Sequence, residues 1–189
     1  WLILNTKLSV SKNFVEQIYR IIFLSRRDSN PLFSLGKAGS KDSFQIGRFR
    51  DHLYLLPNLE IKSLEAGESW SWDIHSPLEL PTGILSSKKV YGEGLSLEFS
   101  HKNLLVKARS GGERCKPLGR SKSQKLKKLL QEYSVPPWLR DRLPLIFVQE
   151  EIAAVADLWV CEEFKAEENE AGFLLRWSDN LNKTTRLEG

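Results

Sequence analysis

Basic side chains concentrate between Lys107 and Arg142, and the chemistry that they could perform is the binding of phosphate. This stretch holds eleven Lys or Arg residues against three acids, so its net charge is +8, whereas the whole chain carries only +4. Lys and Arg neutralise phosphates and release counterions, which gives a salt-sensitive affinity without any reading of bases. A basic segment in a nearly balanced protein therefore favours a polyanionic partner, most often a nucleic acid.

The cations of this stretch are not equally informative. Those of the predicted helix, such as Lys127, would also be expected on a helix face that is merely solvated. The cations of the loop before the helix have no such explanation, so they favour a binding role more strongly. Arg140 and Arg142 could each grip a phosphate or pair with Asp141 or Glu132, and both alternatives stay open. The candidate RNA-contacting residues are Arg109, Arg114, Lys116, Arg120, Lys122, Lys125, Lys127, Lys128, Arg140 and Arg142.

The backbone of this stretch can be predicted from its Gly, Ser and Pro residues. Gly111-Gly112 indicates a tight turn after a strand, and Ser121 or Ser123 could cap the helix that follows. Pro136-Pro137 should end that helix and start the next one, because proline suits a first helical turn. Trp138 beside them could stack on a base, but a core position is favoured. One face of the helix is expected to be apolar, through Leu126, Leu129, Leu130 and Tyr133.

These residues resemble a known family. The run SGGERCKPLGRSKSQKLKKLLQEYSVPPWLRDRLPLIF, followed by EIAAVADLWV, is similar to the C-terminal domain of bacterial tRNA(Ile)-lysidine synthetase. Its VPPWLRDRLP block is the most specific part. A helix followed by FQIGRFRDHLYLLP resembles, more weakly, the middle domain of the same enzyme.

The resemblance implies a function in tRNA modification. The family is a ligase that uses ATP to join lysine to the anticodon wobble cytidine of tRNA(Ile), through an adenylated intermediate. It implies that this part binds the tRNA body, with the acceptor stem as the expected contact, and that ATP, with Mg, binds an N-terminal domain absent from this chain. The family's phosphate loop contains Ser-Gly-Gly-x-Asp-Ser, but here Arg114 and Cys115 stand in the places of Asp and Ser. We therefore interpret Ser110 to Glu113 as a turn, and expect no cofactor and no catalytic residue in this chain.

The chain is expected to be an α+β protein of two small modules. Residues 1–60 predict a helix-plus-hairpin middle domain, with a helix over 11–25 and strands at 44–46 and 53–56. Residues 61–180 predict a mixed, strand-rich C-terminal tRNA-binding domain with the basic helices packed on its sheet, and 181–189 a tail. Its expected strands lie at 70–74, 95–99, 104–108, 145–148, 152–160 and 173–177, with 95–99 and 104–108 as one hairpin and 152–160 central in its sheet.

The remaining composition limits the alternatives. His52, His75 and His101 fall in different predicted elements, and the two cysteines have no zinc spacing, so we expect no metal site and two reduced thiols. No apolar run reaches about 20 residues, so we expect no membrane span and a cytoplasmic protein. A chain that begins with Trp1 and contains no Met is expected to be a fragment. A stand-alone RNA-binding module, and a protein-binding module or homodimer with a solvated basic face, remain open.

Overall fold

The computed structural model divides the chain into two compact units, which are described separately below. One unit contains residues 1–61 and 181–189, and the other contains residues 62–180. The structure describes residues 12–24, 26, 29–35, 44–50, 52–57, 63–181 and 185–187.

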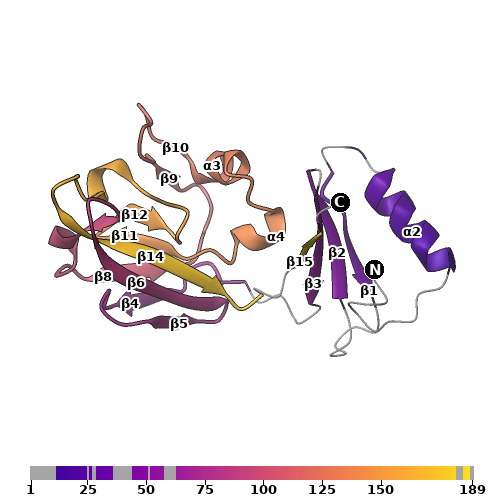
Figure 1. Cartoon of the computed structure of the whole chain (residues 1–189), viewed down its shortest axis with the longest axis horizontal. Coiled ribbons are helices and arrows are strands. Elements are labelled where there is room, and N and C mark those ends of the chain that lie inside the picture. The colour runs from indigo at the N-terminus through magenta and orange to yellow at the C-terminus, as the bar shows by residue number, and fades with distance from the viewer. Residues whose placement is uncertain are drawn as a thin grey trace. The chain divides into compact units, whose positions relative to one another are not determined.

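In its described residues, the first unit combines the helix α2 with an antiparallel sheet (Figure 1). Ile18 of the helix clusters with Ile46 and Leu55 of the sheet, as the apolar face of an amphipathic helix should. The predicted helix is confirmed, and the two predicted strands form a hairpin. The expected C-terminal tail is partly wrong, because residues 185–187 add a strand to this sheet. The elements are α2 (Lys12–Phe23), β1 (Leu32–Leu35), β2 (Phe44–Phe49), β3 (His52–Pro57) and β15 (Thr185–Leu187), and the strand order is β1-β2-β3-β15.

The spacing of Phe14, Ile18, Ile21 and Ile22 predicts that they share one side of α2, with Val15 at its edge. Ile18 is buried and Val15 is exposed, and the side chains of Phe14, Ile21 and Ile22 lie outside the described residues.

The second unit is built mainly from two antiparallel sheets. One has the order β13-β12-β11-β8-β4 and the other β5-β6-β14-β7. The strands of the first are β4 (Ser69–Trp72), β8 (Leu104–Lys107), β11 (Leu145–Val148), β12 (Glu151–Val155) and β13 (Trp159–Val160). Those of the second are β5 (Leu78–Leu80), β6 (Gly83–Tyr91), β7 (Leu95–Ser96) and β14 (Ala171–Asp179).

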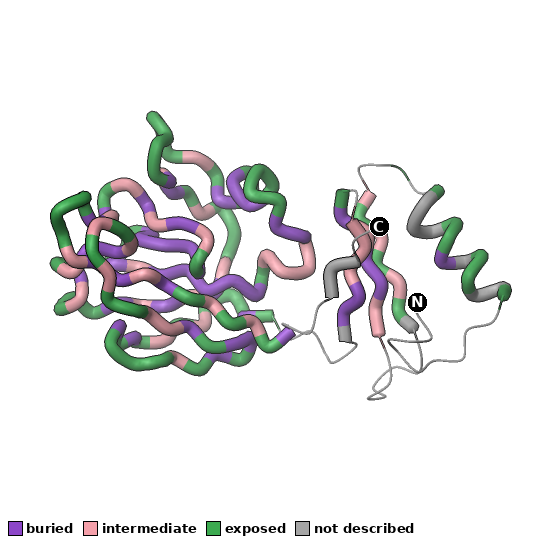
Figure 2. Tube along the Cα trace, viewed as in Figure 1, coloured by how far each residue is buried: buried purple, intermediate pink, exposed green. Residues whose placement is uncertain are grey.

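Both sheets contribute to a single hydrophobic core in this unit. Leu104 and Leu145 come from the first sheet, Leu85 and Leu95 come from the second, and all four side chains are fully buried. Figure 2 shows the buried segments running through the strands of both sheets. β12 lies between β11 and β13, so the predicted central position is confirmed. The expected extent of 152–160 is wrong, because β12 ends at Val155 and the chain turns back into β13.

The predicted hairpin of residues 95–99 and 104–108 is wrong. β7 ends at Ser96, and Leu97–Phe99 form a short 3-10 helix that the hydroxyl of Ser96 caps. β7 pairs with β14, whereas β8 pairs with β4 and β11 in the other sheet. A strand's partner depends on contacts distant in sequence, which alternation of apolar residues does not reveal.

The expectation of basic helices packed on a sheet is not supported. The helices of this unit are short, namely α3 (Leu126–Glu132), α4 (Pro137–Arg140) and the 3-10 helices η1 (Leu97–Phe99) and η2 (Glu162–Phe164). α3 turns leucines, not cations, toward the core. None of the helices in the described part of the chain is long and apolar enough to cross a membrane.

Candidate nucleic-acid interface

A small ribbon and the start of α3 carry most of the candidate cations. The ribbon pairs β9 (Arg114–Cys115) with β10 (Gln124–Lys125), in the register Gln124 to Cys115 and Lys125 to Arg114. The connecting loop lies between them, and α3 follows β10 directly. We call residues 114–128 the basic arm; Figure 1 shows it at one side of the second unit, next to α3.

The apolar face predicted for α3 holds the arm to the core. Leu126, Leu129 and Leu130 are fully buried, as their helical spacing predicts. Tyr133 at the helix end remains 43% exposed, and its ring packs on Trp159 with the centroids 4.4 Å apart. The predicted serine cap is wrong, because Lys125 is the N-cap residue and no side chain caps the helix. The predicted Pro-Pro boundary is confirmed, since α4 begins at Pro137.

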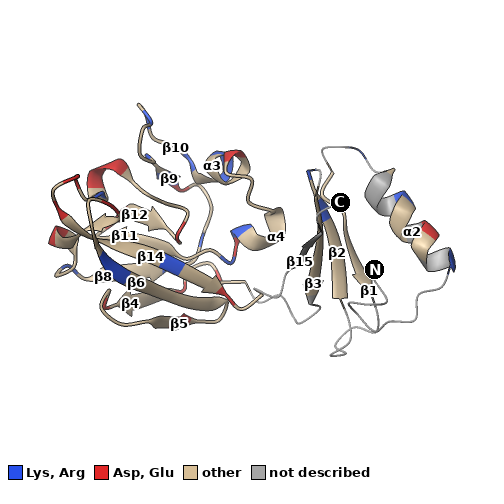
Figure 3. Ribbon diagram, viewed as in Figure 1, with Lys and Arg blue, Asp and Glu red and all other residues tan. Residues whose placement is uncertain are grey.

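Six cations of the arm are exposed to solvent (Figure 3). They come from β9, the loop, β10 and α3, so the local fold gathers charges that are up to fourteen positions apart. Lys116, a seventh candidate, is half-buried. The six are Arg114, Arg120, Lys122, Lys125, Lys127 and Lys128.

Three of these six already have partners within the arm and α3. Arg114 donates from Nη2 to the carbonyl oxygen of Ser123 at 2.8 Å. Glu132 accepts from Arg120 at 2.7 Å and lies 3.7 Å from the Lys128 ammonium. Such exposed pairs contribute little stability, about 0 to 1 kcal/mol, so phosphate could compete for these cations. Lys122, Lys125 and Lys127 make no ion pair with any described residue, which leaves their charges open to a ligand.

Arg109 and Arg140 are less accessible than the arm. The Arg109 side chain is 12% exposed and pairs with Asp141 at 2.8 Å. Arg140 is half-buried and donates from Nε to the carbonyl oxygen of Val135. Burial and then the charge of Arg109 lower the pKa of Arg140, while Asp141 raises it. The suggested pairing of Arg140 with Asp141 or Glu132 is not observed, because Asp141 pairs with Arg109 and Glu132 pairs with Arg120 and Lys128.

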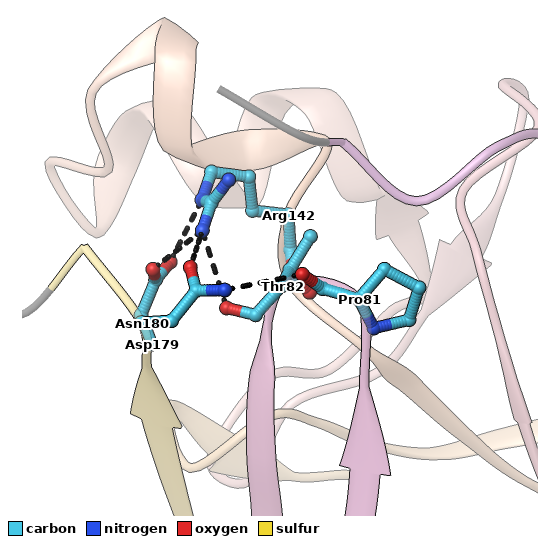
Figure 4. Close-up of polar contacts among 5 residues, drawn as sticks. All are labelled: Pro81, Thr82, Arg142, Asp179 and Asn180. Carbon is cyan, nitrogen blue, oxygen red and sulfur yellow. Dashed lines mark hydrogen bonds and ion pairs between the residues drawn. The ribbon is translucent and has the colours of Figure 1, made fainter. Parts of the chain in front are cut away.

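Arg142 belongs to the interior, and we remove it from the candidate RNA surface. It is 1% exposed, and its guanidinium donates to both carboxylate oxygens of Asp179, at 3.0 and 2.7 Å (Figure 4). It also donates to Asn180 Oδ1 at 2.6 Å and to the Thr82 carbonyl oxygen. The sequence suggested Asp141 or Glu132 as partners, but the observed partner follows 37 residues later, at the end of β14.

The turn at Ser110 to Glu113 binds its own carboxylate. The amides of Ser110 and Gly111 donate to Glu113 Oε1, and Gly111 and Gly112 have φ angles of 93° and 85°. Because Glu113 already occupies the amides that would face an anion, the turn does not fit a nucleotide phosphate. The interpretation of this segment as a turn is confirmed.

We expect acid to weaken this turn through Glu113. Burial raises the pKa of the carboxyl, but the amides of Gly111 and Ser110 and the charge of Arg109 outweigh burial, so the pKa lies below its ordinary value of 4.5. The stabilising contribution is therefore complete above that value and is lost as the pH falls through the folded pKa. An NMR titration of the carboxyl should show the lowered pKa, and Glu113→Gln should reduce the acid-side dependence of stability. An unchanged pH dependence in Glu113→Gln would contradict this account.

Trp138 is half-buried, so it is neither fully in the core nor fully open for stacking on a base, the two alternatives that the sequence left. His52 lies on β3 of the first unit; in the second unit, His75 packs edge-on against Phe173 and His101 is exposed in a turn. Among the residues that the structure describes, no group of three His, Cys, Asp or Glu side chains could hold a metal ion.

Sequence reasoning missed two features of this unit. The long strand β6 exposes Lys88 and Lys89, and β14 beside it exposes Arg176. The sequence GILSSKKVY gives little signal for β6, because Ile84 and Leu85 are both apolar although only Leu85 is buried. Cys115 and Cys161 are both buried near the base of the arm, a proximity for which the sequence holds no signal.

The second unit is a strand-rich domain with exposed cations on an arm that α3 holds to its core. Residues 104–177 match the family model described as TilS substrate C-terminal domain. Two curated tRNA(Ile)-lysidine synthases are similar to the chain: that of Coxiella burnetii is 35% identical over 84% of this chain and 34% of that protein, and that of Photobacterium profundum is 34% identical over 92% and 39%. The resemblance to tRNA(Ile)-lysidine synthetase is therefore confirmed.

The chain spans little more than a third of the length of these relatives. A solved structure titled "Crystal structure of TILS C-terminal domain" is 19% identical, with a TM-score of 0.45, and covers 60% of this chain and 98% of its own.

Proposed function

We propose that this chain is the tRNA-binding C-terminal portion of a tRNA(Ile)-lysidine synthetase. The full enzyme would ligate lysine to the wobble cytidine of tRNA(Ile) with ATP, in the cytoplasm. ATP, with Mg, would bind outside this chain. The similarity to curated tRNA(Ile)-lysidine synthases over most of the chain supports the enzyme class.

The observation that carries the binding role is the exposure of six cations on the basic arm. The leucines of α3 fix the arm to the core, so its charges are presented on a supported surface rather than on a free tail. Double-stranded RNA is recognised mainly through shape and backbone contacts, which suits a group of Lys and Arg without a base-reading pocket. We propose the acceptor-stem side of tRNA(Ile) as the ligand of this arm.

The decisive experiment measures binding of this chain to an isoleucine tRNA transcript over a series of salt concentrations. The test variant is Lys122→Ala/Lys125→Ala/Lys127→Ala, which removes three exposed cations of the arm that make no ion pair with a described residue. If each lysine contacts one phosphate, the slope of log affinity against log salt should fall by about 3. We expect at least about a tenfold loss of affinity at low salt, a free-energy change of about 1.4 kcal/mol.

The matched control is Lys88→Ala/Lys89→Ala/Arg176→Ala, which removes the same charge from exposed positions on β6 and β14. Its affinity should stay within about threefold of the unmodified chain, because a local contact and not net charge carries the binding. An equal loss of tRNA affinity in both variants would indicate non-specific electrostatic attraction and would contradict the proposed interface. Salt-insensitive binding would favour the protein-binding or homodimer alternative instead.

A further inference from the structure

Two cysteines that are 46 positions apart in the chain meet at the base of the basic arm. Cys115 ends β9, and Cys161 precedes η2. The two segments run side by side, because Pro117 and Cys161 form an antiparallel bridge and the amide of Glu162 donates to the Lys116 carbonyl oxygen at 2.9 Å. Cys161 is also fixed through its own amide, which donates to the Ala153 carbonyl oxygen at 2.8 Å. Both thiols are free and buried, with 5% and 3% exposure.

The surroundings of the two sulfurs are unequal. The neighbouring Cys161 side chain lowers the pKa of the Cys115 thiol, against the opposing effect of burial. The neighbouring Cys115 side chain, together with burial, raises the pKa of Cys161. The indole N–H of Trp159 also favours the charged form of Cys115, and its Nε1 is a buried atom with no hydrogen-bond partner at normal distance among the described residues. A thiolate on Cys115 would give that donor an acceptor.

A pocket borders both cysteines. It has a volume of about 410 Å³, and its lining includes both cysteines together with Arg114, Lys116 and Phe147. Buried thiols are ordinarily inert, but a cysteine that favours its thiolate and borders a pocket can react with a small oxidant.

We propose that Cys115 and Cys161 are a reversible oxidation site that closes into an intramolecular disulfide with a small hydroperoxide as the oxidant. The Cys115 thiolate attacks the peroxide oxygen, the O–O bond breaks, and Cys115 becomes a sulfenic acid while an alkoxide leaves and is protonated. The Cys161 sulfur then displaces hydroxide from Cys115, and the proton of Cys161 and the hydroxide leave as water. The two thiols lose two electrons in total, and the peroxide gains them as one alcohol and one water.

The disulfide would fasten the basic arm at its base. The arm is already tied to this region through the amide of Gly119, which donates to Glu162 Oε2 at 3.0 Å. A covalent link between β9 and the residue before η2 would hold the arm's base in place even when these hydrogen bonds open. Disulfides of cytosolic proteins are ordinarily transient and redox-sensing. We therefore expect the bond between Cys115 and Cys161 to form on oxidation and to be reduced again afterwards.

The test treats the native chain with hydrogen peroxide or tert-butyl hydroperoxide, quenches it, and alkylates the remaining thiols after unfolding. We expect an intact mass lower by two hydrogen atoms, no alkylation, and a peptide pair that links Cys115 to Cys161, all reversed by dithiothreitol. The oxidised form should unfold at a temperature higher by about 10 °C, as a typical disulfide gives a domain of this size. Amide hydrogen exchange of residues 114–125 should slow at the same time.

Cys115→Ser and Cys161→Ser separate this reaction from general oxidation. Cys161→Ser should accumulate the sulfenic acid on Cys115, which dimedone labels, whereas Cys115→Ser should react more slowly with peroxide and take no dimedone. Two thiols that both stay open to alkylation, oxygen addition without loss of hydrogen, or a disulfide only between two chains would each overturn the proposal. None of these readouts involves tRNA, so the result does not depend on the proposed function.

Discussion

Replacing Arg142 with Ala is expected to destabilise the second unit by about 3 to 5 kcal/mol, the cost of leaving one member of a buried ion pair without its partner. Arg142 is 1% exposed, and Asp179, whose side chain is 14% exposed, accepts two of its hydrogen bonds. Without the guanidinium, the Asp179 carboxylate would be held away from bulk water beside Asn180, which also loses its donor. Chemical denaturation followed by tryptophan fluorescence would measure the loss.

The network around Arg142 explains why the effect should spread beyond one contact. The guanidinium joins the end of β14 to the turn before β6, where Thr82 is fully buried and donates to the Arg142 carbonyl oxygen at 3.0 Å. Asn180 adds a bond from its side-chain amide to the Pro81 carbonyl oxygen at 3.1 Å (Figure 4). One side chain therefore fixes three chain segments, and its removal leaves several buried polar groups short of partners.

Two comparisons make this prediction specific. Arg176→Ala removes an exposed arginine from the same strand as Asp179 and should change stability by no more than about 0.5 kcal/mol. Arg142→Leu/Asp179→Leu should cost clearly less than the sum of the two single changes, because no charge is left buried alone. If Arg142→Ala reduced tRNA binding while leaving the unfolding transition unchanged, Arg142 would act at the RNA surface and the structural role would be refuted.

Gly94→Ala is expected to destabilise the second unit by about 3 kcal/mol or more, because the added methyl group has no space. A Cβ at this position would lie 2.3 Å from the Phe173 carbonyl oxygen, and Gly94 has a φ of 82°, in the left-handed region. The clash is with backbone, which cannot rotate away as a flexible side chain could. Relief requires β7 to separate from β14 at the Leu95 and Phe173 pair.

Gly119→Ala provides the control for backbone conformation alone. Gly119 has a φ of 77°, but nothing lies within 4 Å of the position that its Cβ would take. It should therefore cost only the left-handed conformation, about 1 kcal/mol. Thermal unfolding of both variants separates the two contributions. Equal losses would show that conformational strain, and not the close approach of β7 and β14, is the reason for glycine at position 94.

Local features of the fold could be predicted well. The leucine spacing in α3 predicted which residues are buried, and Pro136-Pro137 predicted the start of α4. The apolar run from 152 to 160 predicted the central position of a strand, although it did not predict the turn that divides the run into β12 and β13. Each of these follows from backbone propensity or from the period of one element, which neighbouring residues determine. The N-cap residue of α3 was less predictable. Ser121 and Ser123 lie before β10, and the helix starts only after that strand, so neither serine caps it.

The concentration of positive charge, the apolar face that supports it and the resemblance to a tRNA-modifying ligase are all evident in the order of the residues. Which cations are exposed to solvent depends on the folded chain. The fold places Lys122, Lys125 and Lys127 in solvent but buries Arg142 against Asp179, although the sequence alone does not distinguish Arg142 from the exposed cations. It also brings Cys115 beside Cys161. The reason is that exposure and partnership depend on strand order and on the meeting of segments far apart in the chain, and periodicity carries no information about either.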